Sequence, residues 1–170
     1  AFPAFGFLTG SFMRLIVFLF ASFGDELRAI SYVRFQEMKV LMLSLDRGML
    51  DVDSRARARM RAYAAVLDEL HIVIHTSATP NFPDRITDGT MTIYPTRTRY
   101  AFGYFTSAYR LGRRILRERS FDPSADCLTA QDAFPTGVVA WRLRCSTGIP
   151  LELQAHAPFF HSRFMRQSSF

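Results

Sequence analysis

From residue 38 onward, short apolar runs alternate with longer segments of helix-like periodicity, and this alternation is the feature that most constrains the fold. The first run, KVLMLS at 39–44, is typical of a strand that is buried on both faces. Similar short runs predict strands at 71–75, 90–94, 126–130 and 150–155. These five runs therefore predict the strands of one buried sheet.

The stretches between these strands predict three helices, over 55–70, 101–119 and 135–147, and one loop, over 77–89. Ser54 can act as the N-cap of the first helix. An apolar stripe on that helix is formed by Met60, Tyr63, Leu67 and Leu70. Strands that alternate with helices predict an α/β fold, a Rossmann-like parallel sheet with helices on both faces.

Ligands of such sheets bind outside the carboxyl ends of the strands. Those ends are residues 44–48, His75 with Thr76, Gln131 with Asp132, and His156. The chain stops shortly after its last predicted strand, without the helix that such a unit needs. We therefore expect the domain to be truncated at its C-terminus.

Residues 1–37 differ from the rest because they are rich in Phe and have no net charge. Their apolar run at 15–23 is shorter than the roughly 20 residues that span a bilayer. We expect 1–37 to be an extension outside the domain, either a misassigned start or a membrane segment, and 38–170 to be the incomplete Rossmann-like domain. Two cysteines favour a reducing compartment, so we expect a cytoplasmic protein, with the inner face of the membrane as an alternative location.

The chain has 21 basic and 15 acidic residues, a net charge of +6, and Lys39 is its only lysine. This argues against Schiff-base enzymes, P-loop nucleoside triphosphatases and receiver domains, which need a lysine elsewhere. The turn SLDRGMLDVDS has one glycine and lacks the dinucleotide-binding fingerprint. Cys127 and Cys145 have no close-spaced partner for zinc, so no metal is expected. No nucleic-acid motif is present, so no nucleic-acid partner is expected.

The second predicted helix carries an arginine face. Within about one 100° sector of that helix lie Arg110, Arg113, Arg114 and Arg117. Such a sector can contact the headgroups of an anionic membrane, or it can simply be a solvated charged face. The arginines of the first helix fall on both flanks of its apolar stripe and form no single patch.

Three groups at the carboxyl ends are candidate site residues. Asp46, Arg47 and Gly48 can offer backbone N–H groups and a guanidinium to a phosphate, or they can form a solvated loop. His156 can move a proton, although a lone histidine is often structural. Gln131 and Asp132 can hydrogen-bond a sugar or cap the next helix.

Several segments together resemble the N-terminal domain of family 4-like glycosyltransferases. In chain order they are MKVLMLSLDRG (38–48), Ser54 with the RMRAY helix (59–63), DELHIVI (68–74), FD…LTAQDAFPTGVVAWRL (121–143), GIPLELQAHAPFF (148–160) and SRFMRQSS (162–169). No single segment is specific, but the ordered set covers the whole chain from Met38 to Ser169.

The resemblance implies the GT-B fold of two facing Rossmann-like domains, of which this chain is the N-terminal half. It implies transfer of a sugar from a nucleotide sugar to a glycan or lipid-linked acceptor, with no metal or other cofactor. His156 matches a histidine that lies beside the donor sugar and is the expected catalytic residue. The loop 46–48 would face the donor diphosphate, and Gln131 with Asp132 would border the acceptor.

The sequence also departs from this family. The segment HAPFF at 156–160 lacks the carboxylate that often follows the histidine, and the first loop has one glycine instead of two. The E-x7-E motif of the donor domain is absent, so this chain alone is expected to be inactive. A non-catalytic Rossmann-like module that binds a sugar nucleotide or a protein is the alternative.

Overall fold

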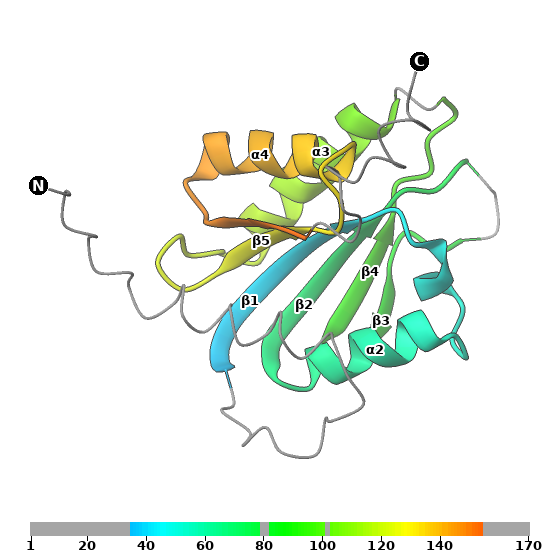
Figure 1. Ribbon diagram of the computed structural model, residues 1–170, viewed down its shortest axis with the longest axis horizontal. Coiled ribbons are helices and arrows are strands. Elements are labelled where there is room, and N and C mark those ends of the chain that lie inside the picture. Colours follow the sequence, from blue (N-terminus) through cyan, green and yellow to red (C-terminus); the bar gives the residue numbers. More distant parts are fainter. Residues whose placement is uncertain (1–34, 79–81, 101–102, 155–170) are drawn as a thin grey trace, which may run out of the picture. The chain divides into compact units, whose positions relative to one another are not determined.

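A mostly parallel sheet forms the centre of the computed structural model, which describes residues 35–78, 82–100 and 103–154, with side chains from Met38 on (Figure 1). In spatial order its six strands in the described part of the chain are β3 (Ile86–Asp88), β4 (Met91–Pro95), β2 (Leu67–Ile74), β1 (Phe35–Ser44), β5 (Cys127–Ala130) and β6 (Leu151–Leu153). All neighbours pair in parallel except β3, which is antiparallel to β4. The predicted α/β fold is confirmed.

Helices cover both faces of this sheet, as the alternating pattern predicts. The 3-10 helix η1 (Arg47–Leu50) and α2 (Arg55–Ala64) lie on one face, and α3 (Gly103–Glu118) and α4 (Thr136–Thr147) lie on the other (Figure 1). Ser54 caps α2 as predicted, because its hydroxyl accepts a hydrogen bond from the Arg57 N–H at 3.0 Å. None of the described helices is long and apolar enough to cross a membrane.

The core is built on β1, whose residues alternate between the two faces. Leu41 and Leu43 are fully buried and belong to one hydrophobic cluster with α3 and α4. Met42 is buried too and points to the opposite face, because successive strand residues alternate. Burial on both faces explains why this strand reads as one continuous apolar run.

The predicted helix over 55–70 is wrong at its C-terminal end. Helix α2 stops at Ala64, and both Leu67 and Leu70 lie in β2, where they are buried. Their spacing fits a helical stripe, but the residues instead form a parallel ladder with β1, in which Leu70 pairs with Val40. Long-range pairing thus overrides local periodicity.

The predicted loop over 77–89 also contains a strand. Residues of β3 pair with β4, and Ile86 lies opposite Ile93 in the register. The two strands are joined at Gly89, whose positive φ of 61° suits a tight turn that glycine adopts without strain. A three-residue edge strand among prolines is too short to leave a clear pattern. In the centre of the sheet, β1 begins at Phe35, ahead of the residue 39 that the sequence predicts.

A buried arginine links helix α2 to the edge strand β3. The Arg57 side chain is 3% exposed; its Nε lies 3.0 Å from Asp88 Oδ2 and its Nη1 donates to the Met49 carbonyl at 2.9 Å. Arg61 Nε lies 2.8 Å from the same Asp88 oxygen. These two arginines, with Arg57 second in effect to Arg61, hold the pKa of Asp88 below its usual value.

We predict that Asp88→Asn lowers the free energy of unfolding by about 2 kcal/mol, because it leaves the Arg57 guanidinium buried without its counter-charge. The matched control is Asp84→Asn, which removes a carboxylate that is 89% exposed and pairs with Arg97 at 2.7 Å. That control is expected to have much less effect. Urea unfolding near neutral pH measures both variants, and equal losses would contradict the account.

Glu152 in β6 provides a second test. Both of its carboxylate oxygens are buried without a hydrogen-bond partner among the described residues, and burial raises its pKa to about 7. A raised folded-state pKa stabilises the fold below the unfolded value of 4.5, and that contribution is lost as the pH rises through about 7.

Replacing Glu152 by glutamine removes this ionisation. We predict that Glu152→Gln and the wild type unfold with similar free energies near pH 4, whereas the variant is the more stable protein near pH 8. Urea titrations of both proteins at the two pH values give the comparison. A difference that does not change with pH would show that the carboxyl does not titrate in the folded state as described.

Candidate functional site

The sheet has a topological switch point between β1 and β5. The chain leaves β1 toward β2 and β4, and α3 then carries it back to β5 on the other side of β1. Open parallel sheets bind ligands at the carboxyl edge of such a point. Three of the predicted groups follow strands that end at this edge: residues 46–48 after β1, His75 after β2, and Gln131 with Asp132 after β5.

A hydrogen bond bridges the switch point itself. Ser44, the last residue of β1, is fully buried, and its hydroxyl donates to Gln131 Oε1. The same hydroxyl accepts a hydrogen bond from the Asp46 N–H at 3.0 Å. The Gln131 N–H donates to the Leu43 carbonyl at 3.2 Å, which continues the ladder one step past β5. The amide of Gln131 is therefore held in a fixed orientation at the centre of the edge.

The loop after β1 is more ordered than its single glycine suggests. Asp46 is the N-cap of η1, and its Oδ1 accepts a hydrogen bond from the Gly48 N–H at 2.9 Å. A Cβ on residue 48 would lie 2.9 Å from that same oxygen, so glycine permits the cap. The Gly48 N–H is thus engaged within the loop. Arg47 is exposed, and its Nε donates to the His75 carbonyl at 3.3 Å.

Two aromatic side chains meet beside Arg47. The ring centroids of His75 and Tyr104, the latter in the first turn of α3, are 4.7 Å apart in an edge-on arrangement. His75 Nδ1 and the Tyr104 hydroxyl are both buried and have no hydrogen-bond partner in the described structure. Buried polar atoms without partners are rare and mark positions where a ligand or a water molecule can bind.

Burial, and then nearby charges, determine the protonation of this pair. Burial, and then the nearby Arg47 guanidinium, lower the pKa of His75, so the imidazole is neutral at neutral pH. Burial, and then the Asp132 carboxylate, raise the pKa of Tyr104, so its hydroxyl keeps its proton. The site therefore offers an O–H group and a neutral imidazole, which suit hydrogen bonds to the hydroxyl groups of a ligand.

Asp132 connects this pair to α4. Its Oδ1 accepts a hydrogen bond from the Thr136 N–H at 3.2 Å, and its carbonyl accepts one from the Thr136 hydroxyl at 3.1 Å. A Cβ on Gly137 would lie 2.9 Å from the Asp132 carbonyl oxygen, so the close turn needs glycine. Asp132 therefore caps the helix that follows β5, one of the two roles that its position predicts, and its carboxylate also acts on Tyr104.

Two predicted features remain, His156 and the arginine face of α3. His156 falls outside the described residues. The arginine face of α3 points away from the sheet and borders a groove between α3 and α4. Within the described ranges, no group of three or more His, Cys, Asp or Glu side chains is arranged to hold a metal ion.

Sequence reasoning missed the roles of Ser44 and Tyr104. Ser44 ends an apolar strand, and a hydroxyl in the last position of a buried strand is a usable signal. Tyr104 gives little signal, because an aromatic residue on the buried side of a helix also fits the core. For His75, the position at the end of a predicted strand is the signal that points to this edge of the sheet.

Comparisons with known proteins bear on the fold. No protein-family model matches the chain, and no curated protein matches it. Among solved structures it is similar to a sucrose-phosphate synthase from Thermosynechococcus elongatus, with a TM-score of 0.50 and 15% sequence identity. The match covers 70% of this chain and 64% of that chain, so this chain spans less than two thirds of the solved protein.

At this identity the likeness concerns the fold alone. The chain has a mixed α/β fold with a mostly parallel sheet, similar to that of this sucrose-phosphate synthase. This comparison, which is independent of the sequence motifs, supports the predicted α/β fold.

We predict that Ser44→Ala destabilises the protein by about 1–3 kcal/mol, because it leaves Gln131 Oε1 and the Asp46 N–H without their partner. The control is Gln131→Ala, alone and combined with Ser44→Ala in a double-mutant cycle, with unfolding measured in urea. The two losses should be less than additive, since each change breaks the same hydrogen bond. Strictly additive losses would show that the bridge contributes nothing.

Proposed function

We propose that this chain is the acceptor-side, N-terminal domain of a family 4-like GT-B glycosyltransferase, and that 1–37 is an extension outside it. The reaction would transfer a sugar from a nucleotide sugar to a glycan or lipid-linked acceptor. The observation that carries the proposal is the pair of buried, unpartnered polar atoms, His75 Nδ1 and the Tyr104 hydroxyl, at the switch-point edge of a glycosyltransferase-like fold. Sugar hydroxyls both donate and accept hydrogen bonds, so they match this pair.

The chemistry requires a positioned acceptor. The acceptor oxygen forms a bond to the anomeric carbon, and the bond from that carbon to the diphosphate breaks with its electron pair. The acceptor proton passes to a neighbouring base or to the leaving phosphate. A rigid edge that orients the acceptor hydroxyl contributes by proximity, and cationic groups stabilise the charge on the diphosphate.

Described residues can be given roles in that scheme. Arg47 is exposed beside His75 and would offer its guanidinium to a phosphate. Gln131, fixed by Ser44, and Asp132, fixed by Thr136, would border the acceptor. Because the Gly48 N–H already bonds to Asp46, the loop would act on phosphate through Arg47 rather than through that N–H.

The catalytic role proposed for His156 rests on its position after the last strand and on the family resemblance. We predict that His156→Ala in the complete gene product lowers turnover at least tenfold with no loss of folding, because the imidazole would contact the donor sugar. His161→Ala is the matched control, since it changes a nearby histidine of the same segment. Turnover near that of the wild type in His156→Ala would remove this role.

A second candidate function is a non-catalytic module that binds a sugar nucleotide or a protein. The carboxylate of Asp46 on the Gly48 N–H favours the protein-binding form of this module, because a phosphate at that N–H would meet a negative charge. The segment HAPFF also lacks the carboxylate that related sequences carry.

One assay separates the two candidates. The complete gene product is incubated with UDP-, GDP- and ADP-sugars and with glycan or lipid-linked acceptors, and release of nucleoside diphosphate is followed. Acceptor-dependent release that is lost in His156→Ala supports the enzyme. Binding of a nucleotide sugar with no release under any pairing supports the module.

A further inference from the structure

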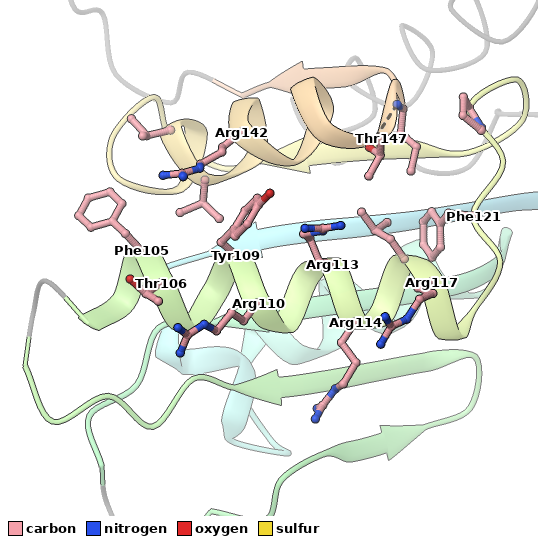
Figure 2. A pocket seen from close by; sticks show the side chains of 15 residues that line it. Phe105, Thr106, Tyr109, Arg110, Arg113, Arg114, Arg117, Phe121, Arg142 and Thr147 are labelled. Atoms are coloured by element: carbon pink, nitrogen blue, oxygen red, sulfur yellow. Dashed lines mark hydrogen bonds between the residues drawn. The ribbon is translucent and has the colours of Figure 1, made fainter.

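A basic groove runs between the outward faces of α3 and α4, on the face of the sheet that these two helices cover (Figure 2). Its volume is about 910 Å³, and it is separate from the unpartnered atoms of the carboxyl edge. Helical geometry places the four arginines of α3 on its outward arc, while the buried side of α3 is formed by Tyr104, Ala108, Gly112, Ile115 and Leu116. The four arginines of α3 are therefore exposed on the outer surface and do not pack against the sheet.

The groove has a large excess of positive charge. Helix α4 adds Arg142 to the four arginines of α3, so five guanidinium groups line one surface. Of these five, only Arg114 lies within 4 Å of a carboxylate in the described part of the chain, with Glu118 Oε1 at 3.9 Å. Charges this close repel one another, so the surface is stabilised when an anion binds to it.

Aromatic and apolar side chains are interleaved with these charges. The guanidinium carbons of Arg113 and Arg142 lie 5.9 and 5.2 Å from the centroid of the Tyr109 ring. Figure 2 shows Phe105, Tyr109 and Arg142 together at one end of the groove. Phe105, which lines the groove, is 38% exposed. Trp141 of α4 is 60% exposed and lies beside the groove rather than in its lining, because it is about 100° from Arg142 around the helix.

This combination identifies the kind of partner. An arginine-rich surface with exposed Trp, Phe and Val side chains matches the interface of a bilayer, where aromatic rings lie among headgroups and arginines meet phosphates. A second copy of this chain would bring arginines against arginines. A nucleic acid would need free aromatic faces for stacking, whereas two guanidinium groups already lie over the Tyr109 ring.

We propose that the face formed by α3 and α4 docks onto an anionic phospholipid surface, with lipid phosphates bound by the arginines of the groove. Phe105 and Trp141 insert beside them at the level of the headgroups. The groove reaches the carboxyl edge through Phe105, whose ring centroid is 5.8 Å from that of Tyr104. Docking therefore brings that edge close to the membrane. This proposal does not depend on the proposed glycosyl transfer.

Trp141 is the only tryptophan of the chain, so it reports on this face without a label. The full 170-residue chain is mixed with phosphatidylcholine vesicles, with and without phosphatidylglycerol, and both sedimentation and tryptophan emission are recorded. We expect binding and a shift of emission to shorter wavelength only with phosphatidylglycerol, and loss of both in about 1 M salt, where charge interactions are screened.

Arginine variants localise the binding. We expect Arg110→Gln combined with Arg117→Gln to weaken binding at least tenfold, because each arginine near an anionic surface contributes separately. The matched control is Arg55→Gln combined with Arg59→Gln, which removes the same charge from exposed positions of α2 on the other face of the sheet. Circular dichroism checks that both variants fold.

Several results would overturn the proposal. Equal weakening by the two double variants would mean that net charge, or the residues before 38 that all variants share, causes the binding. Binding without a shift of Trp141 emission would place the contact elsewhere. Saturable binding of inorganic pyrophosphate or of a single-stranded RNA, with no binding to vesicles, would assign the groove to a free phosphate or to a nucleic acid.

Discussion

The hydrogen-bonded ladder of β2, β1 and β5 is the constraint on which the rest of the structure depends. From Leu41 to Ser44, strand β1 is almost completely buried and pairs in parallel on both sides. Because side chains alternate along a strand, a register shift of one residue would exchange the faces of Leu41 and Met42 and disrupt the packing of helices on both. The apolar content of these few residues thus determines the positions of α2, α3 and α4.

The same ladder positions the candidate site, because the polar residues begin where the apolar run ends. Ser44 is the first buried polar side chain after the leucines of β1, and its bond to Gln131 joins the two strands that flank the switch point. Tyr104 enters from α3, and its hydroxyl is left beside His75 with no partner among the described residues. A rigid core therefore presents an edge whose hydrogen-bonding capacity is not met within the described residues.

Much of this fold could be predicted from the sequence, because buried parallel strands leave short apolar runs that stand out from helical periodicity. The C-terminal end of α2 could not be predicted, because the spacing of Leu67 and Leu70 fits either a helix or a strand. Only the pairing of these residues with β1 determines that they form a strand. Strand β3 could not be predicted either. The role of Asp88 in it depends on an ion pair with Arg57 of α2, a residue far away in the sequence. In the site, spacing located the strand ends, but the contact of His75 with Tyr104 joins distant residues and leaves no local pattern.

The central claim is that the carboxyl edge beside β1 binds a sugar-containing ligand. Two-dimensional NMR of the assigned chain, titrated with nucleotide sugars and oligosaccharides, tests it most directly, because it detects weak binding and maps it residue by residue. The account predicts shifts of the amide signals at 44–48, His75, Tyr104 and 131–132, with α2 unaffected. Shifts confined to the groove between α3 and α4, or no shifts at millimolar ligand, would contradict it.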